Sequence, residues 1–142
     1  MSKIPRDREI ELAWAAGFMD GEGHFGVKKE VGRKHALFMF RTGQIDRQVL
    51  DRLRAAVDAG KVYGPYPRKG LNQKPFHNFN IFGDEAVKAY QQIYPYLSLV
   101  KRAQGDAALE EVKRTKQIPR QHKGIISERI YPWPLLASPT SI

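Results

Sequence analysis

The chain has 142 residues, of which 27% are charged and 42% are hydrophobic, with a net charge of +9 and no cysteine. These values are typical of one globular domain and exclude a disordered chain, a disulfide scaffold, a cysteine-type zinc module and thiol chemistry. The longest apolar stretch, residues 12–19, is too short to span a membrane and the charged N-terminus does not resemble a signal peptide, so we expect an intracellular protein in a bacterial cytoplasm or an organelle matrix.

The first predicted element is a helix over residues 10–19. Its large apolar side chains lie around the whole circumference, which is typical of a helix that is buried on most sides. Ala13, Ala16 and Asp20 share one narrow side, which would let a second backbone approach closely and indicates helix-against-helix packing. Gly21-Glu22-Gly23 is expected to end the helix, because glycine adopts the backbone conformations that a helix end needs.

Two strands follow this helix. Residues 24–30 alternate with period two, with Phe25 and Val27 on one face, which predicts a half-buried strand. The polar turn at residues 31–34 leads into a more apolar strand over residues 36–41. We expect these two strands to pair as a hairpin.

A second helix and a second strand pair come next. Asp46 is a predicted helix N-cap, apolar residues follow at helical spacing, and Gly60 is the expected end. Residues 61–67 and 76–82 form the second strand pair, and two prolines place the first of these strands at a sheet edge or bend. The loop between them, residues 68–74, has three cations and no acid.

Two further helices complete the order. Asp84 is expected to cap the first of them, which Pro95 ends, and the second runs from about residue 98 to 116 with an interruption at Gly105. The order of elements predicts an α+β domain over residues 1–116 whose helices cover one face of the sheet. Residues 117–142 contain four prolines and an apolar patch, and we expect this extension to pack on the domain.

The net charge favours a polyanionic partner. Residues 31–83 contain 10 basic and 3 acidic side chains, so the middle third carries most of the excess. Nucleic acid is therefore the leading candidate partner, and an inert solvated basic surface is the alternative.

The stretch Ala15-Ala-Gly-Phe-Met-Asp-Gly-Glu-Gly23 contains the most specific chemistry in the sequence. Asp20 and Glu22 place carboxylates at the end of a buried helix, and hard cations bind oxygen clusters of that kind. The alternative is that both acids are solvated turn residues.

This stretch resembles the signature of the LAGLIDADG homing endonucleases, whose helix ends in a D-x-[DE]-G turn. The resemblance continues through residues 44–50, 60–66 and 94–97, is followed by Lys101-Arg102, and covers roughly residues 8–115. It implies the αββαββα fold, in which a curved antiparallel sheet docks on DNA and helices cover its other face.

The resemblance also implies an activity. Two signature helices pack together in this family and place their terminal acids over the scissile phosphates. One signature in this chain then implies a homodimer on double-stranded DNA with a near-palindromic target, as in intron homing. The implied dimer contact consists of Ala13, Ala16, Gly17 and Asp20.

The implied reaction is a double-strand break by hydrolysis that depends on Mg²⁺ or Mn²⁺, with no other small-molecule cofactor. The Glu22 carboxylate and the Gly21 carbonyl correspond to metal ligands, Gln44 to a water-positioning group and Lys101 to a cation near the phosphate. Gln44 could instead cap the next helix, and Arg102 competes with Lys101 for the role of the cation.

A twisted sheet with one bare face can lie in the major groove, where donor and acceptor patterns distinguish the bases. Alternation along the strands predicts which strand residues face DNA. The cationic loop suits phosphate contacts and adds further residues. Together, the predicted DNA-contact residues are His24, Lys28, Glu30, Arg41, Tyr63, Arg68, Lys69, Asn78 and Asn80.

Two other function classes stay open. A DNA- or RNA-binding protein of the same fold, such as a maturase or regulator, would bind without cleaving. A nuclease that uses histidine chemistry would need a partner for His77, and no second histidine stands at a suitable spacing.

Overall fold

The computed structural model describes residues 5–32, 35–70 and 72–116. The elements in chain order are α1 (Arg6–Glu22), β1 (Gly23–Lys28), β2 (Leu37–Gln44), α2 (Arg47–Val57), β3 (Lys61–Tyr66), β4 (Phe76–Phe82), α3 (Asp84–Ile93), the 3₁₀ turn η1 (Tyr94–Tyr96) and α4 (Leu99–Lys116). The predicted α+β class and element order are confirmed. The predicted extension, residues 117–142, lies outside the described residues.

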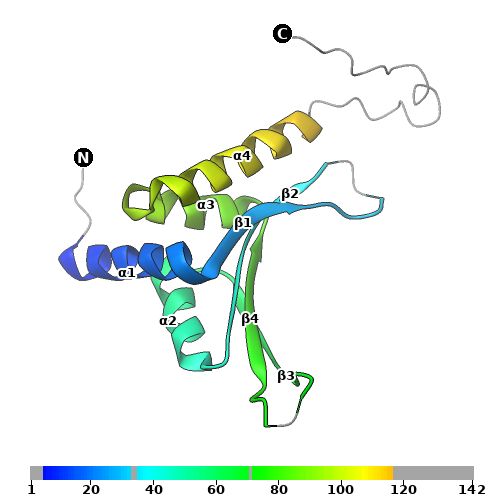
Figure 1. Cartoon of the computed structure of the whole chain (residues 1–142). Helices are drawn as coiled ribbons and strands as arrows, with labels where there is room; N and C mark the ends of the chain where they lie inside the picture. The colour runs from blue at the N-terminus through cyan, green and yellow to red at the C-terminus, as the bar shows by residue number, and fades with distance from the viewer. Residues whose placement is uncertain (1–4, 33–34, 71, 117–142) are drawn as a thin grey trace.

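The four strands form one antiparallel sheet in the order β1-β2-β4-β3. The predicted β1–β2 hairpin is present, and β3, which contains the first of the two prolines, is an edge strand as expected. Helices gather on one side of the sheet, and the other side is open (Figure 1). No helix that the structure describes has the length and apolarity to cross a membrane.

The core lies between the sheet and the helices. Phe25, Phe38, Phe40 and Phe79 are at most 1% exposed, and residues that alternate with them are not buried. The ring of Tyr90 on α3 packs against Phe25 with 4.8 Å between centroids. Alternation along the strands therefore separates an apolar face, which the helices cover, from a polar face that stays open.

Two boundaries near the end of α1 and β2 differ from the prediction. The helix continues through Gly21 and Glu22, and Gly23 is its C-cap with an extended backbone. β2 reaches Gln44 instead of ending at Arg41, because β4 pairs with it along this additional length. Both extensions lengthen the elements that meet beside Glu22.

Two predicted signals at α2 and α3 also need correction. Asp46 caps α2 as expected, since its side chain accepts a hydrogen bond from the Gln48 N–H at 2.9 Å. The helix ends at Asp58, which takes the left-handed conformation with φ 55°, and not at Gly60. Asp84 is the first residue of α3, not its cap, a position that Gly83 occupies.

The predicted interruption of the last helix at Gly105 is wrong, because α4 is continuous over Leu99–Lys116. Gly105 is buried against the ring of Tyr90, and a Cβ at this position would lie 2.2 Å from the ring. Glycine is required here for close packing of α4 on α3 and not for a break.

Gly105→Ala should therefore destabilise the protein, although alanine favours helix. The overlap with Tyr90 outweighs the gain in helix propensity, and we expect a net loss of about 1–3 kcal/mol in urea denaturation. Gly21→Ala is the control, because a Cβ there meets no atom within 4 Å. Equal stability of Gly105→Ala and wild type would contradict this packing.

Candidate functional site

The C-terminal end of α1 is connected to the sheet and to α4 by three hydrogen bonds. Thr42 on β2 donates its hydroxyl to the Glu22 carbonyl at 2.8 Å. The Lys101 ammonium donates to the Gly23 carbonyl at 2.6 Å, and Asp20 accepts the Ser98 N–H at 3.0 Å. The exposed Glu22 side chain thus projects from a backbone that is held on two sides.

Glu22 and Gln44 lie around one open pocket of about 450 Å³. Glu22 comes from the last turn of α1 and Gln44 from the end of β2, and Arg68 from the β3–β4 loop lines the same pocket. Two of the three predicted catalytic residues are therefore brought together, with a cation beside them. Glu22 is the one acid among the residues that line this pocket.

The two adjacent cations on α4 have different surroundings. Lys101 reaches the α1–β1 junction through its bond to Gly23. Arg102 is directed to η1, where it donates to the Tyr94 and Pro95 carbonyls at 3.1 and 2.8 Å and lies over the ring of Tyr94. Of the two, Lys101 is placed beside the candidate site.

The oxygen donors at this junction suit a hard divalent cation, but one chain provides few of them. Glu22 has a carboxylate, and Gly21 has one of the helix-end carbonyls that lack an intrahelical donor. In the described part of the chain, no three acidic, histidine or cysteine side chains gather at one place. Water, phosphate oxygens or a second copy of the junction would supply the further ligands.

The open face of the sheet adjoins the same junction. His24 on β1 pairs with Arg41 on β2, and Arg41 pairs with Asn80 on β4, so these residues form one row across three strands. Together with Asn78 they line a hollow that Glu22 also borders. Four of the predicted DNA-contact residues thus lie side by side next to the candidate catalytic residues.

Burial lowers the pKa of His24, and the positive charges of Arg41 and Lys101 lower it further. The neutral imidazole is favoured as a result. A neutral ring has one donor and one acceptor, which is the hydrogen-bonding pattern that a base edge can match.

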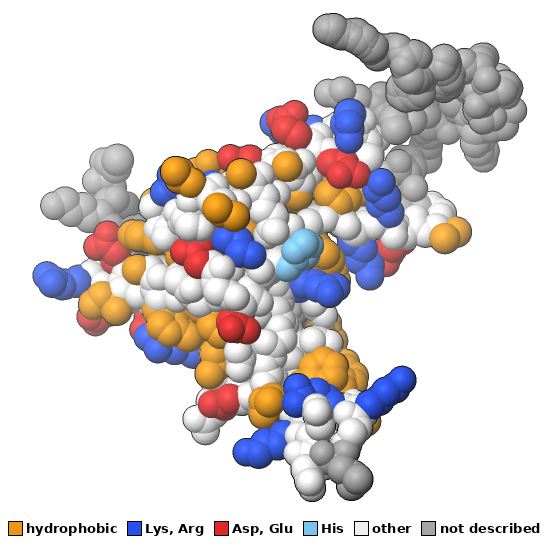
Figure 2. All heavy atoms as spheres, in the orientation of Figure 1, with side chains coloured by type: hydrophobic (Ala, Val, Ile, Leu, Met, Phe, Trp, Pro, Cys, Tyr) orange, Lys and Arg blue, Asp and Glu red, His pale blue; other side chains and the backbone are white. Residues whose placement is uncertain are grey.

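The other predicted contact residues lie farther along the sheet and its loops. Lys28 is at the end of β1, 3.8 Å from Glu30, and its ammonium lies over the Phe82 ring. Tyr63 on β3 is 40% exposed. Arg68 and Lys69 belong to the β3–β4 loop, and Figure 2 shows Lys and Arg side chains around that end of the molecule.

The predicted dimer-contact residues divide into two groups. Ala13 and Gly17 are exposed on α1, and a Cβ at Gly17 would meet nothing within 4 Å. Ala16 is wrongly assigned to this contact, because it is fully buried in the core of its own chain. Asp20 already bonds to Ser98, so its carboxylate has a role within the chain.

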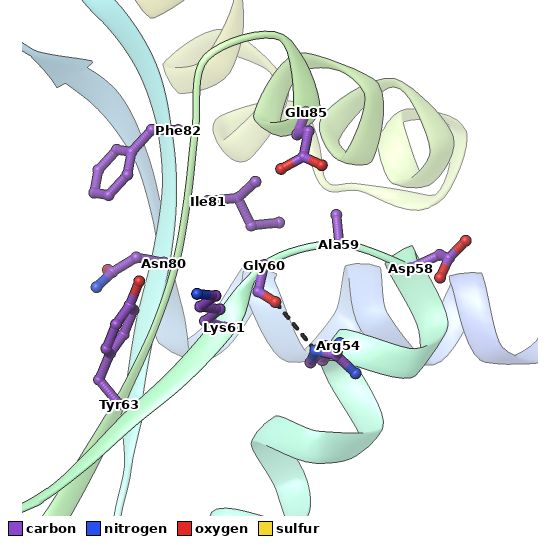
Figure 3. Close-up of a pocket in the computed structure, with 10 residues that line it drawn as sticks. All are labelled: Arg54, Asp58, Ala59, Gly60, Lys61, Tyr63, Asn80, Ile81, Phe82 and Glu85. Atoms are coloured by element: carbon purple, nitrogen blue, oxygen red, sulfur yellow. Dashed lines mark hydrogen bonds between the residues drawn. The ribbon is translucent and has the colours of Figure 1, made fainter.

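A second hollow of about 470 Å³ lies at the edge of the sheet, where β3 begins (Figure 3). It has Tyr63 and Asn80 on its wall, both of them predicted contact residues. The charged residues that line it are two cations, Arg54 and Lys61, and two acids, Asp58 and Glu85. Neither Glu22 nor Gln44 lines this hollow, so it is separate from the candidate catalytic residues.

Sequence reasoning missed two residues at the junction. Thr42 is an inward-facing polar residue that follows Phe38 and Phe40 on the same face of β2, and that change from apolar to polar is a signal. Gln104 accepts from the Phe25 N–H at 2.9 Å and from the Lys101 ammonium at 3.5 Å. Its spacing of three residues from Lys101 places both on one helix face.

No protein-family profile and no curated protein match the chain. Solved structures do. The homing endonuclease I-CvuI in complex with its target in the presence of 2 mM Ca is similar with a TM-score of 0.62 and 21% identity, covering 80% of this chain and 72% of that one. The homing endonuclease I-TnaI is similar with a TM-score of 0.54 and 24% identity, covering 74% and 73%.

The LAGLIDADG meganuclease I-AabMI bound to uncleaved DNA has a TM-score of 0.55 and 24% identity, but the similarity covers 73% of this chain and only 37% of that one. All three similarities concern the fold. The chain therefore has the α+β fold of LAGLIDADG homing endonucleases, and the resemblance noted in its sequence is confirmed at the level of structure.

Proposed function

We propose that this chain, which has the LAGLIDADG homing endonuclease fold, is a site-specific DNA endonuclease. It makes a double-strand break in a long near-palindromic target by hydrolysis that depends on a divalent metal. The observation that supports this most is one continuous surface, on which Glu22 and Gln44 share a pocket next to the row of His24, Arg41 and Asn80. DNA complexes among the similar structures agree with it.

The open sheet face supplies recognition in this proposal. Arg41 can donate two hydrogen bonds to guanine, and the amides of Asn78 and Asn80 suit adenine. These side chains project from paired strands and not from loops, which fixes their spacing along the groove. Arg68 and Lys69 in the β3–β4 loop contact phosphates, which add affinity without reading sequence.

The Glu22 carboxylate and the Gly21 carbonyl would hold Mg²⁺ or Mn²⁺. When bound, such an ion makes water nucleophilic at neutral pH and stabilises charge on phosphate oxygens. Gln44 orients water through its amide. The Lys101 ammonium donates one N–H to the Gly23 carbonyl and one to the Gln104 side-chain oxygen. Its third N–H is left for a phosphate oxygen.

Two copies act together in this proposal, because Glu22 is the one acid that lines the pocket of each chain. Ala13 and Gly17 form a small, exposed surface on α1 through which two helices can cross closely and bring both Glu22 residues together. A twofold contact of this kind presents two identical reading faces, which is why the target is near-palindromic. Residues 1–116 constitute the endonuclease domain in this proposal.

The test is cleavage of a plasmid that contains the uninterrupted sequence from both sides of the gene's insertion point. We expect a double-strand break at one place in Mg²⁺ and none in chelator. Specific binding without any cut, in Mg²⁺ or Mn²⁺, would contradict the proposed activity and favour a protein of the same fold that only binds nucleic acid.

Binding should weaken steeply with salt, because cations that contact phosphates release counterions from DNA. Replacing Arg68, Lys69 and Lys74 with glutamine should flatten the plot of log affinity against log salt by about 0.9 for each phosphate that the loop no longer neutralises. Fluorescence anisotropy at several salt concentrations measures the slope.

The control removes the same charge elsewhere. Glutamine at Lys113, Arg114 and Lys116, in the last turn of α4 on the helix side, should leave the slope close to that of wild type. If both triple variants lowered the slope equally, net charge and not the β3–β4 loop would explain the affinity.

A further inference from the structure

Thr42 is a buried polar side chain on β2, with 6% exposure. It lies on β2 two residues before Gln44, on the face that packs against the helices. Valine would have nearly the same shape without the cost of burying a hydroxyl. Packing alone therefore does not explain why this buried position has a hydroxyl group.

The hydroxyl of Thr42 donates to the carbonyl of Glu22 at 2.8 Å. Glu22 is the last residue of α1, and the last four carbonyls of a helix have no intrahelical donor. The bond satisfies the buried hydroxyl and this carbonyl together. It also joins the residue that ends α1 to the strand that ends with Gln44.

The other two bonds at this junction come from a more exposed or a more flexible group. The bond from Ser98 to Asp20 is exposed, and the bond from Lys101 to Gly23 comes from a long, flexible side chain. Thr42 has one rotatable bond to its hydroxyl and is 6% exposed, at the wall of the hollow that Glu22, His24 and Arg41 also line. Its bond should therefore persist when DNA displaces water from the site.

We propose that Thr42 is a positioning residue that fixes the Glu22 carboxylate relative to Gln44. Thr42 contacts neither DNA nor metal in this role, and it acts only through the backbone of Glu22. The effect that we expect on cleavage rests on the proposed endonuclease function. The structural part of the inference, a fixed α1 terminus, can be measured without DNA.

The experiment compares three variants of the full chain. Thr42→Val removes the hydroxyl and keeps the shape, and Thr42→Ser keeps the hydroxyl. Thr115→Val is the matched control, because Thr115 on α4 accepts from the Ala36 N–H and donates to Val112 far from the junction. Each variant is measured for cleavage in Mg²⁺, for DNA affinity in chelator, and for amide hydrogen exchange at residues 21–23.

Thr42→Val should lower the cleavage rate constant by about 10- to 100-fold, since small displacements of catalytic groups have effects of that size. Its DNA affinity should stay within about threefold, and exchange at residues 21–23 should become faster. Thr42→Ser should keep the cleavage rate and the amide exchange close to those of wild type. Thr115→Val should change neither the cleavage rate nor the exchange at residues 21–23.

A Thr42→Val protein that cuts at the wild-type rate would overturn the proposal. So would a Thr42→Ser protein as impaired as Thr42→Val, or equal impairment by Thr115→Val, since general stability would then be the cause. If wild type itself never cuts, the proposed function fails and hydrogen exchange decides alone. Unchanged exchange at residues 21–23 in Thr42→Val would then overturn the positioning role.

Discussion

Glu22→Gln should abolish cleavage and leave target binding intact. Glutamine keeps the shape and a neutral oxygen but removes the charge that would offset a divalent ion, so we expect the cleavage rate to fall by about 100-fold or more. Affinity should stay the same or rise slightly, because a negative charge near the phosphates is removed. Gel-shift affinity in Ca²⁺ or chelator and cleavage in Mg²⁺ are measured on one duplex.

Glu110→Gln is the matched control for this change. Glu110 is an exposed residue of α4 that pairs with Lys113, and its replacement removes the same charge at a distance from the junction. It should cut like wild type. Near-normal cleavage by Glu22→Gln would remove Glu22 from the active site.

Gly17→Leu should separate the two chains without unfolding either. A Cβ at the exposed Gly17 would meet no atom within 4 Å in its own chain, so we expect the fold to tolerate leucine, whereas a close helix crossing would not. We expect a folded monomer in sedimentation velocity. Affinity for the full target should fall by about 100-fold or more, because the two half-sites are no longer bound together, and cleavage should disappear.

Ala107→Leu provides the comparison, since Ala107 is exposed on α4 and lies outside the α1 surface. This variant should remain a dimer. A wild-type protein that is a well-folded monomer at micromolar concentration, with and without DNA, would contradict the homodimer.

Hydrophobic alternation is sufficient to predict the strands and their faces. Phe25 and Val27 point to the helices, and His24 lies on the open side with Arg41 and Asn80. One buried face fixes this arrangement, since a shift of one residue would invert every side chain. The placement of the predicted base-contact row follows from the same rule.

Small residues cannot be assigned from the sequence, because several kinds of close contact select for them. The helix pattern predicts that Ala16 faces a second chain, but Ala16 is buried in its own core. The same reasoning predicts a helix break at Gly105, which instead permits contact with Tyr90. Which surface a helix turns inward depends on tertiary packing, which a single helix pattern does not contain.

The choice between Lys101 and Arg102 also requires the structure. Adjacent helix residues point about 100° apart, so only one of them can face the α1–β1 junction. The carbonyls of Tyr94 and Pro95 bind Arg102, and Lys101 is left to reach Gly23. Those carbonyls are available because η1 follows α3, a detail that the sequence pattern does not predict.

The proposed function requires that the end of α1 lies against the DNA backbone at the point of cleavage. The chain contains no cysteine, so Glu22→Cys provides a unique site for a tethered iron chelate that cuts nearby DNA when reduced. Lys113→Cys, on α4, provides the control. We predict strand scission at the centre of the target from position 22 and none from position 113. Scission only at the ends of the target, or equally from both positions, would contradict the account.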